Sequence, residues 1–485
     1  MAETTFFWHD YETFGISPRR DRPVQFAGLR TDAELNPIAE PVMWHCQPAP
    51  DFLPDPESVL LTGILPQHAM QHGLPEHQFA AHIEAELARP GTIGVGYNSI
   101  RFDDEVTRFL FWRNLIEPYG REWQNGCSRW DLLDLLRSCW SLRPEGINWP
   151  THQTGERIGQ PSFKLEHLTA ANGLQHAAAH DALSDVQATV ALARLVKNKQ
   201  PKLWDFCLKL RKKAEVQAQM GLGRPFIHLS GMYPVERGCL TIVWPLAAHP
   251  KNKNEVIVWD LAYDPAELAQ LDAATARLRL YTRLADLPEG VHRLPVKTIH
   301  INKSPVVIGN LKTLTPALAQ RWRVDVEQAL RHAERAAHFG RTLDPLWAEV
   351  FSRADAANPA STAPDVDEDL YGGFVGDTDR RLLQRLRELK PEALATRRAA
   401  FEDPRLEELL FRYRARNFVG TLSPAEQTRW QQHCVKRLHG GEGSARTVAA
   451  FFERIDELAE TADERGQVVL EALVDYAESI APEAP

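Results

Sequence analysis

The spacing of apolar residues changes twice along the chain. From residue 1 to about residue 195, short apolar runs with strand character alternate with segments whose apolar side chains recur every three or four positions. Alternating strands and helices are typical of an α/β domain. The predicted strands cover 6–14, 24–32, 41–48 and 92–98, and the predicted helices cover 79–87, 103–115, 129–142 and 182–196.

The rest of the chain shows two other patterns of apolar residues. Between 225 and 310, β-like runs separated by turn residues predict a small β-rich domain, and 311–350 is helical again. Residues 354–369 are rich in Ala, Pro, Ser and Asp and lack apolar periodicity, which predicts an interdomain linker. Beyond it, 377–481 is predicted to form successive helices. The predicted β runs cover 226–233, 239–247, 255–262, 277–284 and 296–309, and the helices are expected to break at Pro391, Pro404, Gly420 and Gly440.

Composition narrows the class of protein. The chain has 485 residues, 44% hydrophobic and 25% charged, so a globular protein of two to three domains is expected. It contains no apolar stretch of about 18 residues, so no membrane span is expected. Its 6 cysteines are scattered without a CxxC pair, which favours the reducing cytoplasm over a disulfide framework or a zinc site. The net charge of −9 does not indicate nucleic acid, although a local basic groove is compatible with it.

Candidate chemistry begins with Asp10 and Glu12 inside the first predicted strand. Successive strand side chains alternate between faces, so these two carboxylates point the same way, about 7 Å apart along the strand. Like charges at this distance repel each other, and a bridging divalent metal removes that cost. The alternative is an edge strand whose polar face is simply hydrated, because the DxE pattern is common.

Two further acidic segments accompany this pair. Asp103, Asp104 and Glu105 open a predicted helix directly after a strand. Acids in a first helical turn are stabilising without any ligand, but Asp103 is nearest the loop and is the candidate to face the first strand. Asp185 lies at the inner edge of an apolar helical stripe, and His180 precedes it by five residues. A lone histidine before a helix is more often a cap or a surface residue than a catalytic one.

Taken together, the three segments supply four carboxylates and one histidine. Four oxygen-donating acids suit two hard divalent cations such as Mg²⁺ or Mn²⁺. Two such ions stabilise the attacking and leaving oxygens of a phosphodiester displacement. A histidine, with an ordinary pKa of about 6.5, can accept the proton of the attacking water. The combination therefore favours metal-assisted phosphodiester hydrolysis.

These residues resemble the DEDDh exonuclease superfamily, in the branch with a histidine five residues before the last aspartate. Longer blocks between residues 9 and 422 resemble the bacterial exodeoxyribonuclease I family within it. They are HDYETFG, GYNSIRFDDEVTR, SRWDLLDLLRSCWSLRPEGINWP, SFKLEHLTAANG, AHDALSDVQAT, HINKSPV and YRARNFVGTL. The resemblance implies an α/β fold with an RNase H-like exonuclease domain (1–196), an SH3-like β domain with extra helices (200–352) and an all-helical C-terminal domain (355–485).

The resemblance also implies an activity and a division of roles. The family degrades single-stranded DNA processively from the 3′ end, releases 5′-mononucleotides, and acts in DNA repair and recombination with two Mg²⁺ ions, which Mn²⁺ could replace. Asp10, Glu12 and Asp185 would hold one ion. Asp10 and Asp103 would hold the other, and His180 would act as general base.

Contacts to DNA outside the metal centre are implied as well. Basic side chains neutralise phosphates, and aromatic faces stack on splayed bases. For Trp123 and Phe163, the simpler interpretation is core packing. Lys164 stands where the family is expected to have Arg, and Lys keeps the charge but loses the bidentate fork; residues 151–160 match no pattern of the family. With Glu12, the implied contacts are Arg108, Tyr119, Trp123, Arg137, Phe163, Lys164, Asn254, Lys297 and Asn302.

The family binds the acidic C-terminal tail of single-stranded DNA-binding protein, and Arg143 and Arg224 resemble that site. A monomer without a membrane partner is expected.

One alternative is a DEDDh 3′–5′ exoribonuclease or a proofreading-type exonuclease, which would need little more than the first 200 residues. A non-catalytic DNA-binding protein on the same fold would be marked by a lost catalytic residue, and all five are present. A structural α/β protein with solvated acids does not explain why the three acidic patterns occur together.

Overall fold

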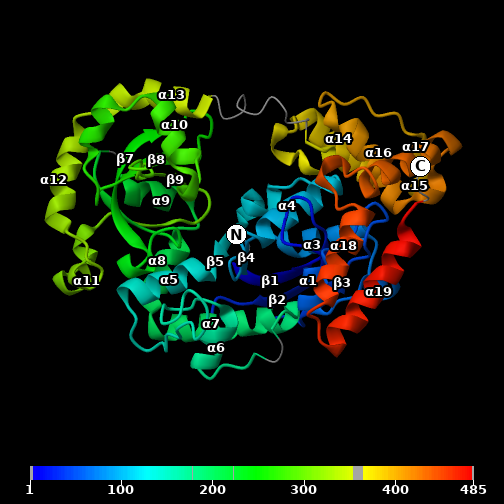
Figure 1. Cartoon of the computed structure of the whole chain (residues 1–485), viewed down its shortest axis with the longest axis horizontal. Coiled ribbons are helices and arrows are strands. Elements are labelled where there is room, and N and C mark those ends of the chain that lie inside the picture. Colours follow the sequence, from blue (N-terminus) through cyan, green and yellow to red (C-terminus); the bar gives the residue numbers. More distant parts are fainter. Residues whose placement is uncertain (1–3, 177–178, 222, 353–363, 483–485) are drawn as a thin grey trace. The chain divides into compact units, whose positions relative to one another are not determined.

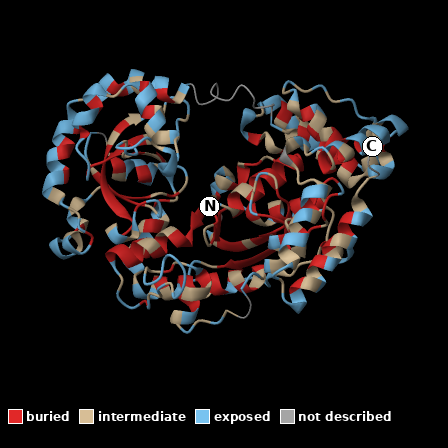
Figure 2. Ribbon diagram, in the orientation of Figure 1, coloured by how far each residue is buried: buried red, intermediate tan, exposed pale blue. Residues whose placement is uncertain are grey.

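The computed structural model describes residues 4–176, 179–221, 223–352 and 364–482. Contacts between residues group the chain into two compact units, each assembled from separate stretches of sequence. Figure 1 labels the elements, and Figure 2 shows that the strands are largely buried. Unit 1 comprises Met1–Ser128, His176–Val190 and Thr362–Pro485, and unit 2 comprises Arg129–Gln175 and Ala191–Ser361.

The first sheet is arranged around strand β1 (Thr5–Thr13). This strand pairs antiparallel with β2 (Pro23–Thr31) and parallel with β4 (Thr92–Gly96), and β2 pairs antiparallel with β3 (Val42–His45). With β5 (Ser128–Asp131), the strand order is β3-β2-β1-β4-β5. The strands predicted over 6–14, 24–32, 41–48 and 92–98 are thus confirmed. Because β1 has a neighbour on each side, its polar side chains are covered rather than left at a hydrated edge.

Two helices cover the sheet beside β1. Phe7 and Phe26 of the sheet pack against Phe79 and Ile83 of α3 and Leu110 of α4, and all five side chains are buried. This apolar cluster fixes where α4 begins, which matters because its first residue is one of the candidate carboxylates. The helices before the second unit are α1 (Pro56–Thr62), α2 (Pro66–His72), α3 (Glu76–Leu87) and α4 (Asp103–Arg113).

The C-terminal part of unit 1 is helical, as predicted. Proline begins α15 at its first residue, Pro391, and Pro404 is the N-cap of α16. Phe451 of α18 and Leu473 of α19 pack against Phe14 from the N-terminal region, so this part shares a core with the sheet domain. The helices are α14 (Asp377–Arg387), α15 (Pro391–Thr396), α16 (Arg405–Asn417), α17 (Pro424–Leu438), α18 (Val448–Ala459) and α19 (Glu464–Ile480).

The predicted linker at 354–369 is partly wrong. Its first part, up to residue 363, lies outside the described residues, but Val366–Glu368 forms a 3₁₀ helix. Asp365 and Asp367, on either side of its first residue, are buried and paired with arginines, including Arg412. An acid-rich, aperiodic stretch looks solvated in the sequence, because its counter-charges come from residues far along the chain.

Unit 2 contains the second sheet, in the order β10-β6-β7-β8-β9, with every neighbouring pair antiparallel. Trp204, Trp259 and Trp347 are among its fully buried side chains. The strands are β6 (Phe226–Leu229), β7 (Leu240–Ala248), β8 (Glu255–Asp260), β9 (Val296–His300) and β10 (Val306–Ile308). Its helices are α5 (Leu132–Leu142), α6 (Leu165–Ala171), α8 (Pro201–Lys209), α9 (Lys213–Met220), α10 (Ala273–Tyr281), α11 (Pro316–Arg321), α12 (Val326–Ala337) and α13 (Asp344–Ser352), and α7 (Ala182–Lys199) contributes to both units.

Two local predictions in this unit are wrong. Residues 277–281 of the run 277–284 form the end of α10 rather than a strand, because Asp272 caps the helix by accepting the Thr275 amide (2.8 Å). Alternating Arg and Leu fit a strand pattern, but Arg277 donates to the carbonyl oxygen of Glu349 in α13 (2.6 Å) and so anchors the helix. The helix predicted over 129–142 begins only at Leu132, since the residues before it belong to β5.

Candidate active site

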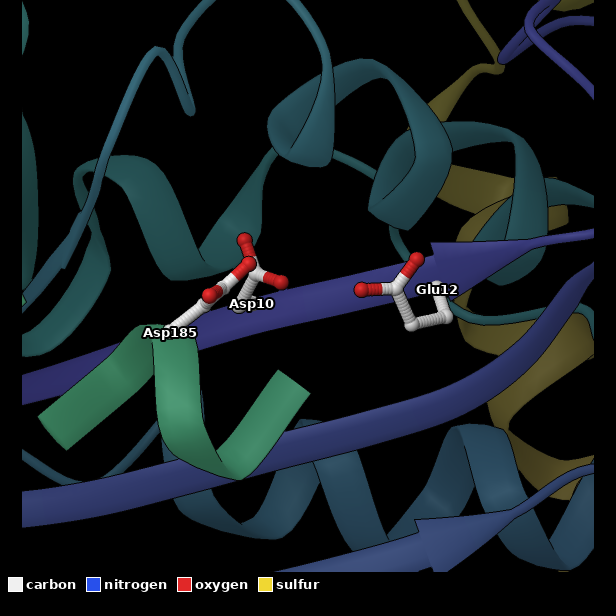
Figure 3. A group of neighbouring side chains, drawn as sticks. All are labelled: Asp10, Glu12 and Asp185. Atoms are coloured by element: carbon white, nitrogen blue, oxygen red, sulfur yellow. The ribbon is translucent and has the colours of Figure 1, made fainter. Parts of the chain in front are cut away.

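Asp10 and Glu12 lie on the same face of β1. In the register with β2, Asp10 is opposite Ala27 and Glu12 is opposite Gln25. Carboxylate oxygens of Asp10, Glu12 and Asp185 all lie within 4.8 Å of one another. Figure 3 shows the three carboxylates pointing toward one another, two from β1 and one from the first turn of α7. This set is called the carboxylate cluster below.

Asp103 reaches the same strand from the start of α4. The backbone amide of Tyr11, between the two acids of β1, donates to Asp103 Oδ1 (3.2 Å). The other two acids of this turn are engaged elsewhere: Asp104 pairs with Arg121 at 2.5 Å, and Glu105 pairs with Arg108 at 2.7 Å. The structure thus bonds Asp103 to β1, between the two acids of that strand.

Gln25 positions the helix that carries Asp185. Its side-chain oxygen accepts the backbone amide of Ala182 (3.1 Å), which is the first residue of α7. Asp181 accepts the Ser184 amide (3.0 Å) and so caps the same turn. Because Gln25 is paired with Glu12 across the two strands, this contact ties the beginning of α7 to the part of the sheet that holds the cluster.

The acids of the carboxylate cluster repel one another, and this raises their pKa values. Burial raises the pKa of Asp10 well above its ordinary value, and Asp103, Glu12 and Asp185 raise it further. Burial, with Asp185 and Asp181 nearby, raises the pKa of Glu12 to about 8. A hard divalent cation would neutralise such a set, and carboxylate oxygens are the donors that Mg²⁺ and Mn²⁺ prefer. The residues present therefore fit a metal centre.

Two histidines lie beside Asp185. His180 is exposed, has a positive φ of 64°, and its backbone amide donates to the Asp185 carboxylate. A second histidine, His176, belongs to no motif in the sequence and places Nε2 at 2.5 Å from Asp185 Oδ1. Burial raises the pKa of Asp185, while His176 and His180 act in the opposite direction. His176 lies nine positions before Asp185 and outside α7, so no helical periodicity links the two. Asp181 and Gln25 were also missed, because each resembles an ordinary cap or strand residue in the sequence.

The expected DNA contacts in unit 1 have different surroundings. Trp123 is 64% exposed, so the core-packing interpretation is wrong for this residue. Arg108 is buried and donates to Glu122 at 2.7 Å, and its guanidinium lies over the half-buried ring of Tyr119. Burial alone would lower the pKa of Arg108, but Glu122 and Glu105 hold it well above the ordinary value. Arg108 is thus permanently charged and is already paired with Glu105 and Glu122.

Unit 2 holds the remaining expected contacts. Arg137, Phe163 and Lys164 line one pocket of about 520 Å³. Phe163 is half-buried and packs edge-on against Trp140 at 5.5 Å between ring centroids, so packing and ligand contact are both compatible with it. Burial lowers the pKa of Lys297 to about 8, and its ammonium lies 3.6 Å from the centre of the Tyr233 ring.

The two expected asparagines lie in loops around β8 and β9. Asn254 accepts a hydrogen bond from Lys213 Nζ (2.8 Å), and Asn302 is exposed. Arg143 lines a second pocket, of about 470 Å³, and Arg224 donates to the carbonyl oxygen of Ala218 (3.1 Å). These residues all belong to unit 2, whereas the carboxylate cluster belongs to unit 1. No described helix is long and apolar enough to cross a membrane.

Comparison with protein families covers almost the whole chain. Residues 7–193 match the family model described as "Exonuclease". Residues 211–353 match the exonuclease I SH3-like domain, and residues 364–480 match the exonuclease I C-terminal domain. The first match contains all four candidate carboxylates and His180. The divalent-metal dependence of the exonuclease family agrees with the carboxylate cluster.

Individual relatives match over the full length. Exodeoxyribonuclease I of Escherichia coli (strain K12) is 44% identical over 482 residues, which cover 99% of this chain and 98% of the relative. A crystal structure of E. coli exonuclease I in complex with a dA16 oligonucleotide has a TM-score of 0.91 at 44% identity, covering 99% of this chain and 100% of that one. The zinc-bound form of the E. coli enzyme–single-stranded DNA complex also has a TM-score of 0.91, at 43% identity over 99% of this chain and 100% of that one. This chain belongs to the exodeoxyribonuclease I family and is an exonuclease.

Proposed function

We propose that this chain degrades single-stranded DNA processively from the 3′ end, releases 5′-mononucleotides, and acts in DNA repair and recombination. The carboxylate cluster is the observation that carries the proposal, because one buried and two half-buried acids converge within 4.8 Å, and the charges that act on Asp10 are those of other acids. The E. coli relatives bound to single-stranded DNA support the choice of substrate.

The carboxylates are assigned to two Mg²⁺ ions, which Mn²⁺ could replace. Asp10, Glu12 and Asp185 would hold one ion, and Asp10 and Asp103 would hold the other. When bound, such a pair of ions stabilises the attacking and leaving oxygens of a phosphodiester. The raised pKa values of Asp10 and Glu12 support this assignment, because they show that the ionised carboxylates are unfavourable here without a nearby positive charge.

His180 is assigned the role of general base, the group that accepts a proton from the attacking water. It is exposed and lies on the turn before α7, with its backbone amide bonded to Asp185. A histidine changes charge near neutral pH and can return the proton to solvent from an exposed position. His176 also reaches Asp185 and is assigned to orient that carboxylate.

Stacking and phosphate contacts would hold the strand. The exposed ring of Trp123 can stack on an unpaired base without reading its identity. Arg137, Lys164 and Lys297 can neutralise phosphates. The remaining contacts are proposed as Arg108, Tyr119, Phe163, Asn254 and Asn302, together with Glu12 at the cleaved end.

Substrate preference is the sharpest test of this function. We would incubate 5′-labelled single-stranded DNA, single-stranded RNA and blunt duplex DNA with the protein, once with Mg²⁺ and once with a chelator. We expect loss of the DNA strand alone, only with metal and without a ladder of intermediates. Equal or faster loss of RNA would move the assignment to the exoribonuclease branch. Digestion of blunt duplex as fast as the single strand would contradict selection for unpaired DNA.

A second proposed ligand is the acidic C-terminal tail of single-stranded DNA-binding protein. The pocket of about 470 Å³ in unit 2 combines the cations Arg143 and Lys202 with the apolar side chains of Leu203 and Phe206. An acidic peptide with apolar side chains complements such a lining. Arg224 also belongs to this region, because its guanidinium lies beside Gly309, which follows Ile308 of the pocket.

Peptide binding tests this second proposal. A fluorescent peptide with the sequence of that tail should bind the wild-type chain and bind at least about tenfold more weakly to Arg143→Ala, since a hydrogen bond to a charged group contributes about 1.5–3 kcal/mol. Equal binding by the two proteins would contradict the site. Hydrolysis of naked DNA by Arg143→Ala serves as the control for folding.

Three further assignments follow the family. We propose domains at 1–196, 200–352 and 355–485, and the matched ranges 7–193, 211–353 and 364–480 support them. We propose a monomer, because one chain supplies all the carboxylates of the cluster. The cytoplasm is proposed because all six cysteines are buried and unpaired with one another.

A further inference from the structure

The loop 151–160 of unit 2 matches no family pattern in the sequence, but the structure gives it a defined conformation. Thr151 and Pro161 form a β-bridge at its base. Above the bridge, the amide of His152 donates to the Gln160 carbonyl oxygen (2.8 Å), and the amide of Gly159 donates to the His152 carbonyl oxygen (2.9 Å). The loop is therefore closed on itself by backbone bonds.

A side-chain bond also fastens the loop to the β-rich part of unit 2. Gln160 Nε2 donates to Glu236 Oε1 (3.1 Å), and Glu236 lies in the 3₁₀ helix Val235–Arg237 between β6 and β7. This contact joins two segments that are far apart in the sequence. The loop and the turn that follows β6 together form the walls of one pocket.

That pocket, of about 520 Å³, has a strongly positive lining. Its charged side chains are Arg137, Arg157 and Lys164, with His152 beside them, and none of the described residues that line it is Asp or Glu. Two of these cations are paired with acids that do not line the pocket: Arg137 with Asp134 at 2.7 Å and Lys164 with Glu166 at 3.3 Å. The full lining is Leu133, Arg137, His152, Arg157, Gln160, Pro161, Phe163, Lys164, Gly231, Met232, Tyr233, Pro234, Val235 and Cys239.

Arg157 differs from the other two cations of the pocket. Its side chain is exposed, and within the ranges that the structure describes it has no ion-pair partner. Met232, on the opposite segment, is 76% exposed and gives the pocket an apolar edge. An uncommitted guanidinium near an exposed apolar side chain suits a ligand that carries both a phosphate and a base.

We infer that loop 151–160 completes a backbone-binding site for single-stranded DNA, in which Arg157 contacts a phosphodiester together with Arg137 and Lys164. This inference rests on the proposed function for its ligand. Arg157 also supplies the planar, bidentate fork that Lys164 cannot offer. The loop thus adds a strand contact to the binding surface and takes no part in the chemistry at the carboxylate cluster.

Salt-dependent binding tests the site without hydrolysis. Binding of a 5′-fluorescein oligothymidylate is measured by anisotropy in the presence of a chelator, over about 50–200 mM NaCl. Arg157→Ala should raise the Kd about three- to tenfold and lower the slope of log K against log salt by about 0.7, the value for one phosphate contact on a single strand. Arg157→Lys should restore most of the slope, and Arg157→Glu should weaken binding further than Ala.

Arg331 provides the matched control. It is an exposed arginine on α12 of the same unit and lines neither of the two pockets described above. Arg331→Ala removes the same charge from the chain, so its Kd and salt slope should stay within error of the wild type. Circular dichroism and the melting temperature check that each variant is folded.

The outcomes separate this site from the proposed function. If wild-type protein binds the oligothymidylate and Arg157→Ala matches it in Kd and in salt slope, the site is wrong while the substrate assignment stands. Equal losses in Arg157→Ala and Arg331→Ala would also overturn the site, because they indicate a general charge effect. If the wild type itself fails to bind single-stranded DNA, the proposed function has failed.

Discussion

Unit 1 contains two groups of buried and half-buried acids, and the charges that surround the two groups are opposite in sign. In the carboxylate cluster, the charges that act on Asp10 are those of other acids, and burial with these neighbours raises its pKa. In the second group, called here the ion network, Asp51, Asp365 and Asp367 are each paired with arginines. Burial alone would raise the pKa of Asp51, but Arg416, His433 and Arg437 hold it well below the ordinary value.

The charges around a group of acids distinguish a structural group from one that can bind a metal. The ion network is balanced within the chain: Arg416 Nη2 donates to Asp51 Oδ2 (2.7 Å), and Arg22 Nη2 donates to Asp367 Oδ2 (3.4 Å). A balanced group serves folding, although its desolvation cost makes its net contribution modest. The carboxylate cluster is left short of positive charge, and that deficit is what a metal ion can fill.

Removing one cluster carboxylate should have the largest effect. Asp185→Ala should lower the rate of single-strand hydrolysis by more than about 10³-fold, since groups that act as a unit lose most activity when one is removed. Binding of single-stranded DNA in a chelator should change little, because Asp185 makes no phosphate contact. A quenched-flow or gel assay gives the rate, and a variant that keeps more than a tenth of the wild-type activity would refute the role.

Breaking the ion network should reduce stability instead of chemistry. Asp367→Asn leaves Arg416 and Arg412 with less counter-charge in a buried site, and we expect a loss of about 3–5 kcal/mol in the free energy of unfolding. Glu457→Gln, in an exposed pair with Arg454, should cost less than about 1 kcal/mol. Denaturant titration measures both. A normal stability for Asp367→Asn, or a specific loss of activity in the folded variant, would erase the contrast between the two groups.

The network should also make the fold sensitive to acid. Because the folded pKa of Asp51 and Asp367 lies below the ordinary value of 3.8, their contribution is complete above that pH and is lost as the pH falls below it. Unfolding free energies measured between neutral pH and about pH 3 should therefore drop steeply at the acid end. Asp367→Asn should flatten that drop, and an unchanged pH profile would contradict the assignment.

Metal and charge neutralisation should stabilise the cluster by smaller amounts. Mg²⁺ at about 100 times its Kd should add about 2.7 kcal/mol to the free energy of unfolding, if it binds only the folded chain.

Glu12, with a pKa raised to about 8, holds its proton more tightly in the folded than in the unfolded chain, so the metal-free fold loses stability as pH rises from 4.5 toward 8. Glu12→Gln should therefore raise the melting temperature of the metal-free protein at pH 8 and reduce the gain from Mg²⁺. A lower melting temperature for this variant would show that the cluster is not repulsive.

Local pattern was sufficient to predict much of the fold and to find the candidate carboxylates that the structure brings together. The two-residue spacing of Asp10 and Glu12 placed them on one strand face, and the position of Asp103 at the first turn of a helix singled it out. The run 277–284 was misjudged because a helix cap outside the run decided its structure. The pairing of His176 with Asp185 and the ion network could not be predicted from the sequence, because the tertiary fold and not sequence spacing brings these partners together.

The pairing of Asp51 with Arg416 spans 365 positions and has a consequence for how the chain is made. A ribosome exposes Asp51 and every carboxylate of the cluster long before Arg416 and Arg437 leave the exit tunnel. The apolar partners of Phe14 in α18 and α19 are translated later still. We therefore expect stalled or prematurely terminated chains to fold poorly, so that nuclease activity is acquired only when translation is nearly complete.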